Sequence, residues 1–291
     1  MTHDPAALAS RCRVVPGKEI RLDDWDPADR LGLSKPEAEA LLEANAPRLE
    51  AVHERLYASR TWSVLMLLQG MDASGKDGAI KRLAAGLNPQ GLRVVSFAAP
   101  SSLELSHDFL WRIHAALPPR GHVGVFNRSH YEDVVAPRAN PALLPRLGLP
   151  PELVGPGIWT ERLGAIAAFE AYLAQQGTAL AKVFLHISRE EQRERLLARL
   201  DDPAKEWKFD PSDFAARDRW TEHRAAYEAA FAATATATAP WYIVPADSKP
   251  VARALVQSIL LTTLEGLDLD RPAPSPERRA EMEAARKALT A

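Results

Sequence analysis

The feature that most constrains the fold is a glycine-rich loop between an apolar run and a helical pattern. The loop reads GMDASGKDG over residues 70–78, after the apolar residues 63–68 and before a helical pattern at 79–87. A strand, a loop and a helix in this order predict a phosphate-binding loop, whose backbone N–H groups and helix N-terminus face an anion. The predicted phosphate-binding residues are Gly70, Ala73, Ser74, Gly75, Lys76, Asp77 and Gly78.

Two acidic residues distinguish this loop from the common pattern. The position after the lysine usually carries Ser or Thr, whose hydroxyl binds magnesium, but here it is Asp77, and Asp72 is a second acid. Two carboxylates repel a polyanion unless a divalent cation lies between acid and phosphate. We therefore expect Mg²⁺ at the loop, with Mn²⁺ as the alternative ion. Asp77 also fits an N-cap of the following helix.

A second polar cluster follows a short apolar run within residues 121–134. The apolar part predicts a neighbouring parallel strand, and a Walker B element is expected at its carboxyl end, beside the phosphate loop. Asn127 occupies the place where an aspartate is common, and Glu132 and Asp133 follow later. Arg128 comes just after the strand, where it can reach a transferred phosphoryl group or form a local ion pair.

These two segments and a third one resemble the three signatures of the family 2 polyphosphate kinases. The third segment covers residues 195–208 and reads RLLARLDDPAKEWK, and the resemblance extends over about residues 40–265. It implies that inorganic polyphosphate donates its terminal phosphate to AMP or ADP, reversibly and with magnesium. The ending YEDV at residues 131–134 resembles the subgroup that phosphorylates both nucleoside monophosphates and nucleoside diphosphates, and the alternative is an enzyme that acts on only one of AMP or ADP.

The motifs and the resemblance together give roles to single residues. The expected catalytic residues are Asp72, Lys76, Arg128 and Asp133, and the expected metal ligands are Asp72, Asp77 and Asp133. The expected nucleotide contacts are Arg112, Asn127, Arg128, Glu132, Arg195 and Lys205. Arg112 and the nearby His114 fit an ordinary helix surface equally well, and Asn127 can orient a neighbour instead.

A basic lid is predicted after the fourth strand. Arg195 and Arg199 are four residues apart and share one helix face, which costs about 0.2–0.5 kcal/mol unless an anion lies between them. Lys205 and Lys208 follow in an adjoining insertion. A lid that closes over phosphates excludes water and prevents hydrolysis. The alternative is a solvated surface helix whose acids balance its bases.

Polyphosphate requires further cations beyond the loop. Lys81 and Arg82, one turn into the helix after the loop, are expected to begin a polyphosphate channel, together with Arg199 and Lys208. Ordinary helix surface is the alternative for Lys81 and Arg82.

The alternation of strands and helices predicts an α/β protein. Right-handed crossovers turn such a chain into a three-layer P-loop kinase fold with a central parallel sheet and a helical lid. Five strands are expected, at about residues 63–68, 93–98, 122–126, 179–187 and 241–245, with single helices at 103–117 and 214–233. Residues 1–34 are predicted to form an irregular N-terminal arm, 35–265 the kinase domain with a lid at about 189–224, and 266–291 a C-terminal helical tail. This tail is expected to dock through Met282 and Leu289 or to be partly free.

Composition limits the partners of the chain. The net charge is −2, which provides no overall field that would attract nucleic acid or an acidic membrane. The single cysteine, Cys12, excludes an intramolecular disulfide and a cysteine-based zinc site. The sequence shows no secretory pattern and no 18-residue uncharged apolar run. We therefore expect a cytoplasmic homo-oligomer without nucleic-acid or membrane partners, in which the helix near residues 34–58 is the candidate interface.

Two other functions compete with polyphosphate-dependent transfer. A conventional ATP-dependent nucleotide kinase needs two base-binding pockets, and only one candidate base contact, residues 247–249, is visible. A non-catalytic nucleotide or polyphosphate sensor would tolerate loss of the acids or of Arg128, which are all present. Trp207, Trp220 and Trp241 could stack on a base, but large aromatic residues are more often part of the core.

Overall fold

The computed structural model contains a five-stranded sheet at its centre, and it describes residues 3–204, 207, 211–270 and 273–290. All neighbouring strands are parallel, in the order β2-β3-β1-β4-β5. The strands are β1 (Ser63–Gly70), β2 (Leu92–Ser96), β3 (Val123–Asn127), β4 (Thr178–His186) and β5 (Trp241–Pro245). The predicted α/β fold with a five-stranded parallel sheet is confirmed.

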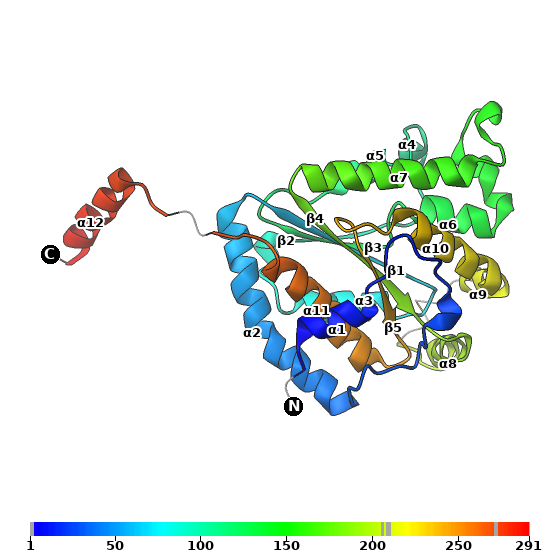
Figure 1. Ribbon diagram of the computed structural model, residues 1–291, viewed down its shortest axis with the longest axis horizontal. Helices are drawn as coiled ribbons and strands as arrows, with labels where there is room; N and C mark the ends of the chain where they lie inside the picture. The colour runs from blue at the N-terminus through cyan, green and yellow to red at the C-terminus, as the bar shows by residue number, and fades with distance from the viewer. Residues whose placement is uncertain (1–2, 205–206, 208–210, 271–272, 291) are drawn as a thin grey trace.

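Helices cover both faces of this sheet and give the molecule three layers (Figure 1). One face carries α1 (Pro5–Cys12), α2 (Lys35–Ser59), α3 (Lys76–Ala84) and α11 (Lys249–Glu265). The other face carries α6 (Glu132–Ala139), α7 (Ile158–Gln175) and α10 (Trp220–Thr234). Short 3₁₀ turns occur at Leu22–Asp24, Pro89–Gly91, Pro141–Leu147 and Pro151–Leu153. None of the helices in the described part of the chain has both the length and the apolar character needed to cross a membrane.

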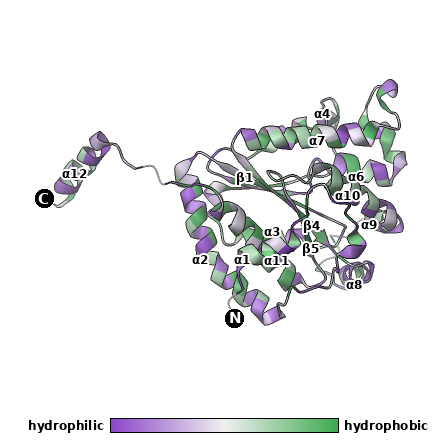
Figure 2. Ribbon diagram, in the orientation of Figure 1, coloured by the Kyte–Doolittle hydropathy of each residue, from purple (hydrophilic) through white to green (hydrophobic). Residues whose placement is uncertain are grey.

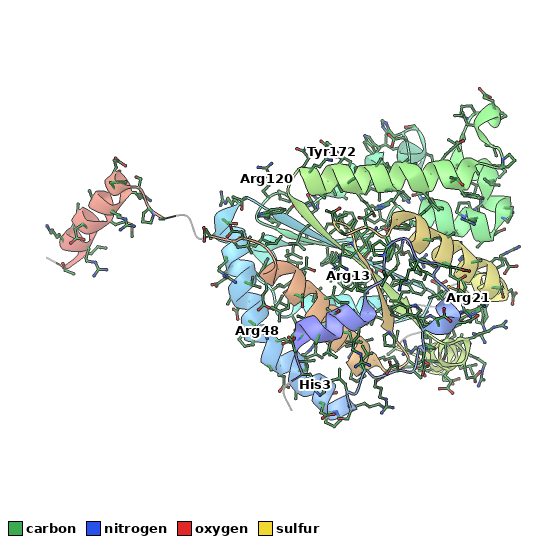
Figure 3. All side chains as sticks on the ribbon, in the orientation of Figure 1. His3, Arg13, Arg21, Arg48, Arg120 and Tyr172 are labelled. Atoms are coloured by element: carbon green, nitrogen blue, oxygen red, sulfur yellow. The ribbon has the colours of Figure 1, made fainter. Side chains whose placement is uncertain are left out.

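The central strands form the core because they are covered on both faces. Every residue of β1 is buried, as is expected of a parallel strand between two helical layers. The long helix α2 begins with a capping box in which Ser34 and Glu37 satisfy each other's backbone N–H groups. Its buried side packs against α11, and Arg48, labelled in Figure 3, donates to the carboxylate of Glu265 on α11.

The N-terminal arm is more regular than its composition suggested. Asp4 caps the helix α1 through its side chain, and Pro5 takes a first-turn position that needs no N–H donor. The helix packs on α11, and Arg13 then forms a bridge to Tyr242 of β5 (Figure 3 labels Arg13). The expectation of an irregular arm over residues 1–34 is therefore wrong for residues 5–12.

Two predicted helices are each divided. The helix expected at 103–117 appears as α4 (Ser102–Leu105) and α5 (Trp111–Ala116), because the side chain of Asp108 accepts from the N–H of Leu110 and starts a new turn. The helix expected at 214–233 appears as α9 (Pro211–Asp218) and α10, since Arg219 between them leaves helical backbone geometry.

The C-terminal helix α12 (Pro276–Thr290) lies away from the rest of the molecule (Figure 1). Figure 2 shows hydrophilic and hydrophobic segments on both α2 and α12, but only α2 lies against the sheet layers. No residue of α12 is buried, and Met282 and Leu289 are exposed. The prediction that α12 docks through these two residues is therefore wrong, and the structure agrees with the alternative, a tail that is at least partly free.

We expect Leu56→Ala to lower the free energy of unfolding by about 2–5 kcal/mol, because Leu56 is completely buried and its loss leaves a cavity. The matched control is Leu289→Ala on α12, where 88% of the residue is exposed and the expected change is below about 0.5 kcal/mol. Urea titrations followed by circular dichroism measure both changes. Equal losses in the two variants would contradict the described packing.

Candidate active site

The predicted phosphate loop and the second polar cluster lie side by side because their strands are neighbours. Leu68 of β1 pairs with Asn127 of β3, so the carboxyl ends of both strands reach the same edge of the sheet. The next strand on the other side of β1 is β4, which comes later in the chain. The loop after β1 therefore lies where the strand order reverses, the usual place of ligand sites in parallel sheets.

The loop depends on two glycines with left-handed backbone angles. Gly70 has φ +149°, and a Cβ atom there would lie 2.7 Å from Ser74 Oγ and 2.8 Å from the carbonyl oxygen of Leu185. Gly75 has φ +107° directly before α3. Side chains at these positions would strain the backbone or collide with it. The loop therefore has the close-wrapped form expected of a phosphate cradle.

Lys76 points back into the loop. Its Nζ donates to the carbonyl oxygens of Gly70, at 2.7 Å, and Met71, at 3.2 Å, and the residue is buried. Burial lowers the pKa of Lys76, and the charge of Arg128 lowers it further. The positive charge of Lys76 is thus held at the loop, where an anion would stabilise it.

Arg128 joins the two segments through ion pairs. Its Nη2 lies 2.7 Å from Asp72 Oδ1, and its Nη1 lies 3.2 Å from Glu132 Oε2. Glu132 and Asp72 together outweigh burial and raise the pKa of Arg128, so the guanidinium stays charged. The backbone of Arg128 has φ +64°, which costs about 1–2 kcal/mol in a residue with a Cβ atom. The local ion pair that the sequence allowed is present, and strain at this position is typical of a functional site.

Asp77 does not cap the helix that follows the loop. The N-cap is Gly75, and Asp77 lies inside the first turn of α3. Its Oδ1 accepts a 2.9 Å hydrogen bond from Nδ2 of Asn127. The N-cap interpretation of Asp77 is therefore wrong. Asn127 orients a neighbouring side chain, which is one of the two roles expected for it.

Asp133 and Arg112 form a nearly buried pair. Arg112 Nη2 donates to Asp133 Oδ2 at 3.0 Å, and Nη1 donates to the carbonyl oxygen of Ala98 at 3.0 Å. Burial raises the pKa of Asp133 although Arg112 acts to lower it. This pair links α5 to the start of α6. The expected roles of Asp133 in catalysis and metal binding, and of Arg112 in nucleotide binding, stay predictions.

The helix α8 (Arg189–Leu200), where the lid is predicted to begin, is attached to the phosphate loop. Gln192 donates to the carbonyl oxygen of Asp72 at 3.0 Å. The guanidinium of Arg195 donates to Glu191 on its own helix and to four backbone carbonyl oxygens, those of Ala73, Ser74, Ala246 and Asp247. Arg195 thus holds the loop and the end of β5 together, and its expected nucleotide contact stays a prediction. Lys205 and Lys208, expected in the lid, lie outside the described residues.

A cavity of about 670 Å³ opens between the phosphate loop, α8 and the start of α11. Its lining includes six cationic side chains: Lys76, Arg128, Arg195, Arg199, Lys249 and Arg253. Trp207 also lines it and is 78% exposed, so the core interpretation is wrong for Trp207. That interpretation holds for Trp241, which is completely buried, whereas Trp220 is partly buried against the core.

Arg253 is the cationic residue that the sequence reasoning missed. A Cβ atom on Gly78 would lie 3.0 Å from Arg253 Nη2, which places the guanidinium directly over the start of α3. A signal was present, since Arg253 follows Lys249 by four residues and so shares its helix face. Lys81 and Arg82 are exposed and are not part of the cavity lining.

The carboxylates of the site fit a magnesium ion that is completed by phosphate oxygens. Within the described residues, no three His, Cys, Asp or Glu side chains are grouped as a metal cage. Mg²⁺ rarely uses such a cage, because it keeps several waters and binds through one or two carboxylates and substrate phosphates. Asp72 and Asp77, which line the cavity beside the loop, offer such carboxylates.

Comparison with known proteins places this geometry in a family. The family model described as Polyphosphate kinase 2 (PPK2) matches residues 32–272. The chain is 42% identical over 272 residues to the ADP-polyphosphate phosphotransferase of Rhodopseudomonas palustris, covering 93% of this chain and 94% of that protein. It is 44% identical over 265 residues to the AMP/ADP-polyphosphate phosphotransferase of Meiothermus ruber, covering 90% and 95%.

A solved structure agrees with these sequence relatives. The crystal structure of polyphosphate kinase 2 from Arthrobacter aurescens TC1 covers 98% of both chains with a TM-score of 0.87 and 39% identity. Family model, sequence relatives and solved structure agree over almost the whole chain. The resemblance noted from the three sequence motifs is thereby confirmed: the chain belongs to the polyphosphate kinase 2 family.

Proposed function

We propose that this enzyme transfers the terminal phosphate of inorganic polyphosphate to AMP and ADP, forming ADP and ATP in a reversible reaction. The observation that carries the proposal is the cavity at the phosphate loop, where six cationic side chains outnumber the four acids in the lining: Asp72 and Asp77 of the loop, and Glu191 and Glu194 of α8. A chain of phosphates presents repeated negative charge without a base, which matches a cavity rich in cations. Two relatives of similar length are named an ADP-polyphosphate phosphotransferase and an AMP/ADP-polyphosphate phosphotransferase.

The residues present can perform the transfer by positioning and charge stabilisation. The loop amides and Lys76 hold one phosphate, and Arg128, at the edge of the cavity, neutralises charge that spreads over the transferred group. Asp72 aims Arg128 through the 2.7 Å ion pair. In this proposal α8, the first helix of the predicted lid of about residues 189–224, is hydrogen-bonded to the loop through Gln192 and Arg195 and limits access of water to the phosphoryl group.

We propose Mg²⁺ as the metal, with Asp72 and Asp77 as its first candidate ligands and Asp133 as a further one. When bound, the ion neutralises phosphate oxygens and aligns donor and acceptor. The proposal also includes acceptance of both AMP and ADP, which the YEDV ending supports. We also propose that the enzyme is cytoplasmic, as its nucleotide substrates are. We further propose that it is a homo-oligomer whose subunits contact each other through α2.

An assay with a single phosphate donor tests the function. Purified protein, MgCl₂ and AMP are incubated with polyphosphate in one reaction and with ATP in another, and nucleotides are separated by ion-exchange chromatography. We expect ADP and then ATP from polyphosphate alone. ADP without ATP would restrict the acceptor to AMP. Transfer from ATP only would contradict the proposal and favour a conventional nucleotide kinase.

Lys76→Ala and Arg128→Ala are each expected to lower kcat/KM about a hundredfold or more, because each removes a positive charge from the reacting phosphates. The control is Lys287→Ala, which removes an exposed charge on α12 and should keep the wild-type rate. Circular dichroism confirms the fold of each variant. Near-wild-type turnover by either folded site variant would remove that residue from the mechanism.

Two matched variants test whether polyphosphate contacts the cavity lining or the exposed side of α3. Arg253→Gln is expected to raise the KM for polyphosphate about tenfold or more, since it removes a charge-assisted phosphate contact inside the cavity. Lys81→Gln removes a charge of the same sign outside the cavity lining, and we expect a change below about twofold. A larger effect of Lys81→Gln would favour the channel along α3 that the sequence suggested.

Removal of divalent metal should stop transfer without unfolding the protein. Excess EDTA is expected to abolish product formation, and added MgCl₂ should restore it, because phosphate charge must be neutralised for in-line transfer. The melting temperature should stay within about 2 °C, as Mg²⁺ here would bind mainly with substrate. Full activity in EDTA would overturn the proposed metal role.

A further inference from the structure

Three completely buried residues lie directly between the site residues Arg128 and Glu132. Ser129, His130 and Tyr131 are each 0% exposed, whereas Arg128 and Glu132 are partly exposed at the site. A left-handed backbone at a residue with a Cβ atom persists only where its surroundings hold it. The contacts of residues 129–131 therefore hold the backbone from which the Arg128 side chain extends, whereas the ion pairs with Asp72 and Glu132 hold its guanidinium.

A buried polar network holds this segment. Tyr131 OH donates to Glu170 Oε1 at 2.8 Å and accepts from Lys182 Nζ at 3.2 Å. The same Nζ donates to Glu170 Oε2 at 2.5 Å and to the carbonyl oxygen of Thr234 at 2.8 Å. His130 Nε2 lies 3.3 Å from Glu170 Oε1. All five residues are at most 1% exposed, so none of these contacts is shared with bulk solvent.

The network connects the active-site segment to elements far apart in the sequence. Glu170 belongs to α7, Lys182 to β4, and Thr234 is the last residue of α10, which lies on the same side of the sheet as α7 (Figure 1). On the other side of the segment, Gln69 at the end of β1 donates to Ser129 Oγ at 3.1 Å. Three consecutive residues are thus fixed to four separate elements.

Stability alone does not account for such a network. A buried ion pair is often no more stable than apolar side chains of the same volume, because both charges lose water. Burial acts to raise the pKa of Glu170, but Lys182 and His130 outweigh it and the pKa is lowered, so the carboxylate stays charged. A charged acceptor fixes the direction of the Tyr131 hydroxyl, which apolar packing cannot do.

We propose that Tyr131, Glu170 and Lys182 are positioning residues for phosphoryl transfer: their buried network fixes residues 129–131 and thereby sets the place of the Arg128 guanidinium. The inference rests on the phosphotransfer function proposed above. None of the three residues lines the cavity, so each acts through Arg128 and not on a substrate.

The first test compares two buried tyrosines of the same molecule. Tyr131→Phe keeps the ring in place and removes only the hydroxyl, and we expect kcat to fall about tenfold while the KM values for AMP and polyphosphate change less than about twofold. The matched control is Tyr242→Phe on β5, 8% exposed and with no part in the network, which should keep the wild-type kcat. An unchanged kcat in folded Tyr131→Phe overturns the inference.

A double-mutant cycle separates positioning from general loosening of the core. In an Arg128→Lys background, whose lower rate is the new reference, Tyr131→Phe should change kcat less than about twofold, because the group it positions is already altered. The same tenfold loss in both backgrounds would show that Tyr131 does not act through Arg128, and would overturn the inference.

Two further results keep the test decisive. Should Tyr131→Phe fail to fold, Ser129→Ala removes the Gln69 contact from the same segment, and it should reproduce the fall in kcat and its disappearance in the Arg128→Lys background. A fall that persists there would overturn the inference. Wild-type protein without polyphosphate-dependent transfer would overturn the proposed function and this inference together, whereas an active wild type with unaffected variants overturns the inference alone.

Discussion

The parallel pairing of β1 with β3 is the constraint on which the active site depends. Parallel strands end at the same edge of a sheet, so the segments that follow β1 and β3 must meet there. The ion pair between Asp72 and Arg128 spans this junction, with one residue supplied by each segment. A change of strand order would separate the two residues even if both motifs were intact.

Local charge, and not net charge, governs the site. The chain as a whole carries a net charge of −2, yet one cavity collects six cationic side chains around the phosphate loop. Some of these cations have structural work as well. Arg195 donates hydrogen bonds to the loop and to the residue after β5, so α8 and the phosphate loop form one connected unit. Some cations near the phosphate loop are thus stabilised by contacts within the protein and not by substrate alone.

Beneath the site, the protein uses polar contacts where apolar packing would fill the same space. Lys182 and Glu170 are both buried, and their partners include Tyr131, three residues after Arg128. Directional bonds define an orientation more narrowly than dispersion contacts do. The cost of burying these charges is offset by their hydrogen bonds to each other, to Tyr131 and to the carbonyl oxygen of Thr234. The strained backbone of Arg128 lies three residues before Tyr131 in the chain.

The sequence by itself determined the parallel sheet, the phosphate loop and the family, because strand runs, glycines and long motifs are local patterns. The helix α1 also had a local signal, the N-cap residue Asp4 directly before Pro5. The prediction of an irregular arm missed this signal because the composition of residues 1–34 is mixed. Only the tertiary structure decided which charged residues face each other. Arg112 and Asp133 are 21 residues apart and yet form a pair, and Arg253 reaches the loop from a helix that begins more than 170 residues later. Sequence spacing sets neighbours along one helix or strand, whereas contacts between elements depend on how layers pack, which no local pattern encodes.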